Sequence, residues 1–290
     1  MRIEGEILEV GIDWITCVGF TPDSQNSMQS FAEQLIRQER DSGNDFRPWR
    51  FAGYEGFMCG GCQCGVRDDS TCVRLSSGLA DSNWERLYAM SENATRIDLQ
   101  VTIRPERPAL KVLAQVHRQA LRKAAKRSGG PTVTLIRSTD GSGTVYLGKR
   151  SSDAFGRVYL KGAESGLDHY HNALRFEVEF KGPQVRSAIA HISRESPRIV
   201  PVASLVSGFF TARGVDLQFP TIAKVMLCIS RPLTSDAKRL AWIQNQVRPS
   251  VQLLISHGWY TEVLEALGLF ESLTTVSDSS RLIQRVTEGE

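Results

Sequence analysis

Two stretches of the chain alternate strictly between apolar and polar residues, and this period of two limits what the chain can form. In TRIDLQVTIR (95–104) the apolar residues occupy every second position, and LRFEVEFKG (174–182) repeats the pattern. Successive side chains of a strand point to opposite faces of a sheet. Each stretch is therefore predicted to be a strand with one apolar face against a core and one charged face away from it.

Other segments have the period of a helix. Apolar residues over 28–36 predict a helix with Ser27 as its N-cap and 41–43 as its end. A longer helix is predicted over 110–124, closed by the glycines and proline of 129–131. Helices and alternating strands together predict an α+β fold, an antiparallel sheet flanked by helices.

We expect three parts along the chain. Residues 1–95 form an N-terminal α+β half that binds DNA, 96–232 a catalytic half, and 233–290 a helical segment with a polar tail. In the last part, helical spacing is interrupted at Pro249 and stops at Gly258 before another short helix. We find no run of about 18 apolar residues that could span a membrane, so the prediction is a cytoplasmic protein without a membrane partner.

The distribution of charge says more than the formal net charge of +3. Residues 101–161 hold thirteen Arg or Lys against three acids, a net charge of +10. Such a segment attracts phosphate, although residues 111–127 taken alone are more typical of a solvated helix face.

Four of the six cysteines crowd into one glycine-rich stretch, at Cys59, Cys62, Cys64 and Cys72. A structural zinc site usually pairs two hooks of the CxxC kind across a longer loop. The spacing here favours a turn between two short strands over a zinc site.

The sharpest chemical signal is Tyr159 in GRVYLKGAE (156–164), which is predicted to be a strand with Arg157, Tyr159 and Lys161 on one face. Neighbouring strands would bring that face beside Glu177 and Glu179. A tyrosine hydroxyl with cations to hold phosphate oxygens has the parts needed to attack a phosphodiester.

Asp98, Glu177 and Glu179 are predicted to converge on this face. Converging carboxylates repel one another unless a positive charge lies between them, and oxygen ligands select Mg²⁺ or Mn²⁺ over zinc. The bland alternative is an antiparallel strand pair with one solvated, charged face.

At these residues the chain resembles the Rep_trans family of plasmid and phage replication-initiation factors, which includes rolling-circle initiators and some conjugative relaxases. The resemblance is carried by YLGKRSSDAFGRVYLKGAESG (146–166) and LRFEVEFKG (174–182). Weaker resemblance covers most of the remaining chain. It implies an HUH-like replication-initiator fold. The related superfamily often binds its metal through a His-hydrophobe-His motif, and we expect His169 and His171, which have this spacing, not to be that motif.

The resemblance also implies roles for the residues. Tyr159 corresponds to the nicking tyrosine, assisted by Lys161 and Arg175, and the three carboxylates to a metal site. The residues expected to contact DNA phosphate are Arg150, Arg157 and Lys181.

The resulting hypothesis is a rolling-circle replication initiator, a site-specific nicking and joining endonuclease that resembles a type I topoisomerase in chemistry. It would nick one strand at an origin through a covalent 5′-phosphotyrosine, with Mg²⁺ or Mn²⁺. Its expected partners are the origin duplex, the nicked single strand, a host helicase and a second copy of the chain. Three alternatives stay open: a conjugative relaxase, a DNA-binding regulator that does not nick, and a metal-dependent nuclease in which water replaces Tyr159.

Overall fold

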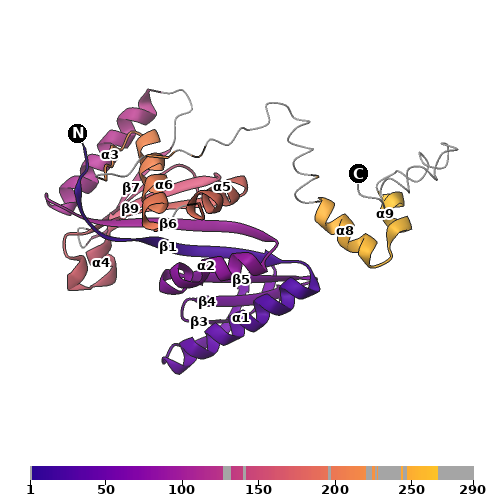
Figure 1. The fold of residues 1–290 in the computed structure, drawn as a ribbon. Coiled ribbons are helices and arrows are strands. Elements are labelled where there is room, and N and C mark those ends of the chain that lie inside the picture. Colours follow the sequence, from indigo (N-terminus) through magenta and orange to yellow (C-terminus); the bar gives the residue numbers. More distant parts are fainter. Residues whose placement is uncertain are drawn as a thin grey trace. The chain divides into compact units, whose positions relative to one another are not determined.

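The two alternating stretches lie side by side in a ten-stranded sheet, which the computed structural model arranges in the order β2-β3-β4-β5-β1-β6-β10-β9-β8-β7 (Figure 1). Every pairing between these strands is antiparallel. The strands are β1 (Gly5–Gly19), β2 (Phe46–Phe51), β3 (Tyr54–Cys59), β4 (Cys62–Arg67), β5 (Ser70–Ser76), β6 (Asn93–Pro105), β7 (Val133–Arg137), β8 (Gly143–Leu147), β9 (Ala154–Leu160) and β10 (Leu174–Lys181). The predicted α+β class with an antiparallel sheet is confirmed.

The structure describes residues 2–126, 132–139, 142–194, 197–219, 224, 225, 227, 243 and 247–266. The helices in these ranges are α1 (Pro22–Asp41), α2 (Ser77–Met90), α3 (Ala109–Ala125), α4 (Lys161–Ser165), α5 (Pro183–Ile192), α6 (Ile199–Ala212), α8 (Arg248–Ser256) and α9 (Tyr260–Ala266), with a 3₁₀ turn η1 at Asp168–Tyr170. Among them, no helix has both the length and the apolar character needed to cross a bilayer.

The chain divides into two units, Met1–Ile229 and Ser230–Glu290. The first holds the whole sheet, and β1 pairs with β6 along almost its full length. The sheet is therefore continuous across residue 95, where we placed a boundary, and the assignment of DNA binding to one half and catalysis to the other stays a prediction.

One face of the sheet carries the core. Strand residues such as Ile15, Leu75, Leu99 and Val178 form a single apolar cluster with residues of α1, α2, α3, α5 and α6. The register explains this shared face, because Ile15 lies opposite both Leu75 and Ile97. All the charged residues that alternate with this set must then point to the other face of the sheet.

Several predicted boundaries need correction. Thr21, and not Ser27, caps α1: its hydroxyl accepts from the Ser24 amide at 3.4 Å, and Pro22 fits the first turn because it has no amide hydrogen to pair there. The predicted end of this helix near 41–43 is confirmed. We predicted neither α5 nor α6, and α6 is apolar on nearly all sides because it is buried.

The second unit contains α8 and α9. We expected Pro249 to interrupt a helix, and this is wrong. Pro249 lies in the first turn of α8, where proline is favourable. Gly258 follows α8 with a φ of +87°, which glycine adopts without strain, and confirms the predicted stop. Leu240, part of the predicted helical spacing, lies outside the described residues.

Candidate functional site

The polar face of β6, β10 and β9 brings the predicted site residues onto neighbouring strands. Glu179 lies opposite Asp98, and Arg175 lies opposite Tyr159. Asp98, Arg175, Glu177 and Glu179 are all buried, so their charges must be compensated within the protein.

Tyr159 is held by one of these carboxylates. Its hydroxyl donates a hydrogen bond to Oε1 of Glu177, while the Arg157 guanidinium donates to Oε2 of the same carboxylate. Burial raises the pKa of the Tyr159 hydroxyl well above its ordinary value, and the Glu177 charge raises it further. The tyrosine is therefore neutral at physiological pH and needs a base before it can act as a nucleophile.

Arg175 lies deeper in the face than we predicted. Its side chain is 5% exposed, and its Nε donates to the Thr102 hydroxyl at 2.8 Å. Its other nitrogens pair with Glu9 and, at 3.7 Å, with Asp13. All three nitrogens of this guanidinium contact protein groups, and Arg175 lies opposite Tyr159 on the neighbouring strand. These contacts favour a role in positioning the site over direct contact with phosphate.

Two irregularities in β1 supply those acids. The register against β6 shifts between Ile7 and Glu9 and again between Ile12 and Trp14. The second shift leaves Asp13 as an extra residue on the bulged strand, and a bulge re-aims side chains. Burial raises the pKa of Asp13, and the charge of Glu177 raises it further. Sequence analysis missed both acids, because alternation alone cannot locate a bulge.

Asp98 and Glu179 share a cation. Arg96 Nε donates to Asp98 at 2.7 Å, and its Nη2 lies 3.0 Å from Glu179. Lys181 Nζ also lies 2.6 Å from Glu179. Burial raises the pKa of Asp98 to about 6 in spite of Arg96, which lowers it.

These contacts bear on the predicted metal site. Glu177 faces Tyr159, whereas Asp98 and Glu179 face Arg96, and among the described residues no three His, Cys, Asp or Glu side chains gather as metal ligands would. Arg96 already supplies the positive charge that we expected of Mg²⁺ or Mn²⁺. The three residues as placed do not fit a metal ion.

The strand that carries Tyr159 ends one residue later than the tyrosine, so the predicted extension through Lys161 is wrong. Lys161 begins α4, and its amide bonds to the Ala173 carbonyl at 3.0 Å. Gly162 allows this turn, because a Cβ there would lie 2.5 Å from the Tyr170 carbonyl oxygen. Lys161 Nζ still reaches the site, 5.7 Å from the centre of the Tyr170 ring and 2.6 Å from Glu164.

A second tyrosine lies at the same end of the face. Tyr170 comes from η1, between the two histidines that we expected not to form a metal motif, and its hydroxyl donates to Glu9 at 2.9 Å. The Arg175 guanidinium lies 5.8 Å from the centre of its ring. His169 and His171 are exposed, and neither joins a metal cluster of the described residues.

The remaining predicted DNA contacts lie at the opposite end of β10. Lys181 Nζ donates to the Arg150 carbonyl oxygen, and Arg150 itself is exposed. No described contact joins the Arg150 side chain to Tyr159.

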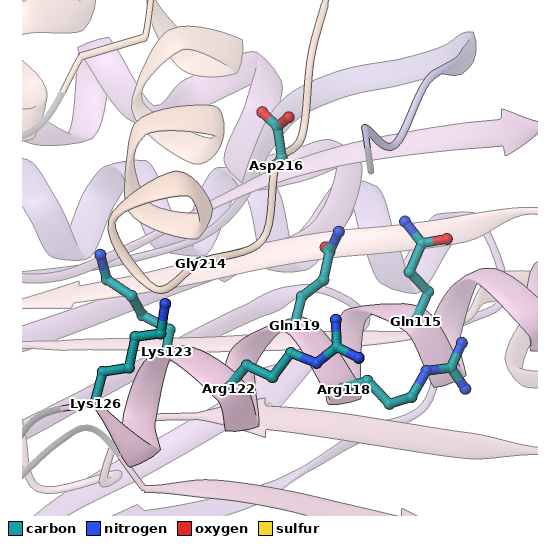
Figure 2. A pocket seen from close by; sticks show the side chains of 8 residues that line it. All are labelled: Gln115, Arg118, Gln119, Arg122, Lys123, Lys126, Gly214 and Asp216. Carbon is teal, nitrogen blue, oxygen red and sulfur yellow. The ribbon is translucent and has the colours of Figure 1, made fainter.

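The basic segment also contributes α3, whose outer side lines a hollow of about 480 Å³ (Figure 2). Figure 2 shows the side chains of Arg118, Arg122, Lys123 and Lys126 along the helix, beside Gly214. The apolar side of α3 packs in the core, so this hollow lies on the helical layer and away from the polar face that holds Tyr159.

The glycine-rich cysteine stretch forms a hairpin, as predicted. Cys59 lies opposite Cys62 at the turn between β3 and β4. The cysteines of the described part are free thiols, and burial raises the pKa of Cys64 to about 12 and that of Cys72 to about 11. Among the residues that the structure describes, no three of these side chains gather as metal ligands would.

An α+β scaffold with a half-buried tyrosine, hydrogen-bonded to a buried carboxylate on the polar face of its sheet, is the class of protein that these observations define. No protein-family model matches the chain, and no curated protein matches it. One solved structure similar to it is a rolling circle replication initiator protein from Geobacillus stearothermophilus, with 17% identity and a TM-score of 0.46. The similarity covers 80% of this chain and 91% of that one. This similarity is too distant to assign the chain to a family.

Proposed function

We propose that the chain nicks and rejoins one DNA strand through Tyr159, as a rolling-circle replication initiator does. The observation that carries the proposal is the hydrogen bond from the Tyr159 hydroxyl to the buried Glu177 carboxylate, beside a cluster of cations. The resemblance of the surrounding strands to the Rep_trans pattern supports the choice of DNA as substrate.

In the nicking step, the Tyr159 oxygen attacks the phosphorus and Glu177 accepts the phenolic proton. The new bond joins the tyrosine oxygen to the phosphorus, and the bond from phosphorus to the 3′ oxygen breaks. The 3′ oxygen leaves as a hydroxyl after taking up a proton, and the 5′ phosphate stays on the enzyme. Attack by a 3′ hydroxyl on this phosphotyrosine reverses the step and joins the strand without a nucleotide cofactor.

The cations divide into two groups in this proposal. Arg157, one-third exposed although paired with Glu177, would contact phosphate oxygens directly. Lys161, 14% exposed and paired with the exposed Glu164, would do so after exchanging that carboxylate for phosphate. Arg175 is a positioning residue, since its nitrogens are occupied by Thr102, Glu9 and Asp13. Lys181 and Arg150 would hold the strand farther along the face.

The predicted requirement for Mg²⁺ or Mn²⁺ stays a prediction, and no step above depends on it. Nicking assays with EDTA, Mg²⁺ or Mn²⁺ test it directly. Activity in EDTA would agree with the arrangement around Arg96, whereas a strict metal requirement would mean that Arg96 leaves Asp98 and Glu179 when DNA binds.

The remaining expectations are part of the same proposal: action in the cytoplasm, assembly as a homodimer, and a host helicase as partner. A conjugative relaxase would use identical chemistry and differs in its DNA site. A regulator that does not nick, and a nuclease that uses water, are outcomes of the experiment that follows.

The test incubates the protein with single-stranded DNA from its own replicon, labelled either at the 5′ end or at the 3′ end, because a 5′-phosphotyrosine link keeps only the 3′ label on the protein. Denaturing gels then compare the wild type with Tyr159→Phe and with Tyr170→Phe, a matched loss of one phenolic hydroxyl. We expect label to stay on the wild type and on Tyr170→Phe, and to be absent from Tyr159→Phe.

Three other results contradict the proposal. Cleavage without an adduct, unchanged in Tyr159→Phe, means a water-using nuclease. Binding without cleavage means a regulator, and loss of the adduct only in Tyr170→Phe makes Tyr170 the nucleophile.

A further inference from the structure

A stripe of aromatic rings and one arginine continues the polar face of the sheet toward β2. We call Trp14, Trp49, Phe51 and Arg74 the aromatic stripe. The Arg74 guanidinium carbon lies 4.2 Å from the ring centre of Phe51, 4.6 Å from that of Trp14 and 5.5 Å from that of Trp49. These distances are within the range of cation–π interactions.

The stripe joins the candidate active site through Arg96. The guanidinium carbon of Arg96 lies 5.0 Å from the centre of the Trp14 ring, and the same guanidinium pairs with Asp98 and Glu179. Trp14 is opposite Asp98 in the register of β1 and β6. Arg96 therefore lies between the stripe and the carboxylates of β6 and β10.

Arg74 has unused capacity to bind a ligand. Its Nε is buried and has no hydrogen-bond partner, and among the described residues it forms no ion pair. Burial lowers the pKa of this guanidinium. A buried donor without an acceptor is costly, so an incoming acceptor such as a phosphate or a base oxygen would be favoured here.

The rings are held in place, and their exposure differs: Trp49 is buried in a small apolar cluster with Val18, Tyr54 and Cys72, Trp14 is half-buried, and Phe51 is exposed. Trp49 packs over Gly65, where a Cβ would lie 2.9 Å from the indole ring. Phe51 stacks on Trp49 with ring centres 6.0 Å apart, and its side chain is 47% exposed. Any residue larger than glycine at position 65 would lift the indole, so this strand pair is shaped around a flat aromatic surface.

The charges of β2 to β5 favour an anionic partner for the stripe. By strand alternation, Arg47 and Arg67 share the face of Arg74. Within these four strands the one carboxylate is Glu55, which lies on the other face and pairs with Arg50 at 3.2 Å. Outside the strands, Asp68 lies 3.9 Å from Arg67. Flat rings beside cations are the features that bind single-stranded nucleic acid, through base stacking and phosphate contacts.

We infer that the aromatic stripe binds unpaired bases of the DNA strand whose phosphate lies at Tyr159. This inference rests on the proposed function and adds that the substrate is single-stranded next to the nick. Trp14 is three strands from Tyr159 and, by register, four residues away along the strand direction, which is roughly 19 Å at the spacings of a sheet, or about six stacked nucleotides.

The test measures binding of a fluorescent single-stranded oligonucleotide by anisotropy, with Tyr159→Phe protein so that no covalent product forms. Adding Phe51→Ala is expected to weaken binding about tenfold, and Phe51→Tyr, which keeps a ring, to restore it. Phe57→Ala is the matched control, because Phe57 is 50% exposed on the opposite face of the same hairpin, and it should leave binding unchanged.

Equal losses in Phe51→Ala and Phe57→Ala, or no loss in either, would overturn the inference. The inference would also be overturned if single-stranded and duplex oligonucleotides of the same length bound with equal affinity and Phe51→Ala changed neither affinity. A change of oligomeric state in Phe51→Ala with unchanged binding would assign the stripe to a second copy of the chain. The anisotropy experiment measures binding and not nicking. Its result can therefore be interpreted even if Tyr159 proves not to be the nucleophile.

Discussion

The buried carboxylates of the polar face each have their own partners, and these partners give Glu177 a role different from that of Glu179. Both carboxylates are buried on β10, two residues apart, with 2% and 6% exposure. Glu177 accepts a hydrogen bond from Tyr159, whereas Glu179 contacts Arg96 and Lys181. The pair therefore allows two roles to be separated with equivalent substitutions.

Glu177→Gln should slow nicking about 100-fold or more, because an amide cannot take the proton of Tyr159, while DNA affinity changes little. Single-turnover cleavage and anisotropy measure the two quantities. The matched substitution Glu179→Gln should slow nicking far less. Equal losses in both variants would instead favour a shared metal site.

For single residues, the alternation of the sequence predicted which side chains share the polar face of the sheet. Tyr159, Asp98, Glu177 and Glu179 are among them. The alternation did not predict which side chains pair, because pairing depends on rotamers and on Glu9, Asp13 and Arg96, which come from other strands or other positions. The bulges in β1 that deliver the first two follow from pairing with β6 and leave no trace in the local pattern.

Among the elements, α1 depends on a carboxylate that is distant in sequence. Glu92, just before β6, accepts from the Phe20 amide at 2.8 Å and from the Ser24 hydroxyl at 2.8 Å. It also accepts from the hydroxyl of Thr21, the N-cap residue. A negative charge at this helix end is favourable for the unpaired amides and the helix dipole.

These contacts predict a pH-dependent stability. Burial alone would raise the pKa of Glu92, but the hydrogen bonds from Thr21, Phe20 and Ser24 lower it below its ordinary value of 4.5. The stabilisation is therefore present above that value and is lost as the pH falls through the lower, folded-state pKa.

Glu92→Gln should lower the free energy of unfolding by about 1 kcal/mol at pH 7. The difference from the wild type should shrink as the pH falls below about 4.5, where Glu92 itself becomes protonated. Urea denaturation across this pH range measures it. Glu33→Gln, at an exposed position of α1, is the control and should change stability little at any pH. A pH-independent loss in Glu92→Gln would contradict the role of its charge.

At the scale of the whole molecule, one core supports the sheet and the site. The apolar cluster runs from Ile3 to Phe219, with Val225 and Leu227 packed against it, and all of these residues belong to the unit Met1–Ile229. The first unit thus contains the interactions that a folded domain needs.

A fragment of residues 1–229 should therefore fold and unfold in one cooperative transition, with a melting temperature within a few degrees of that of the full chain. Circular dichroism and calorimetry measure this. A fragment that is unfolded, or that melts far lower, would show that residues 230–290 supply part of the core. Nicking by this fragment would also locate the chemistry in the first unit.

The sequence by itself determined the class of fold, the main strands and helices, and the face on which Tyr159 and the three carboxylates lie. It could do so because the periods of strands and helices are local properties of the chain. Only the tertiary structure decided that Glu177 holds Tyr159, that Arg175 is buried, that Lys161 begins a helix, and that Trp14, Trp49, Phe51 and Arg74 form one surface. Those contacts join residues far apart in sequence, and strand order, bulges and side-chain burial fix them together when the sheet assembles.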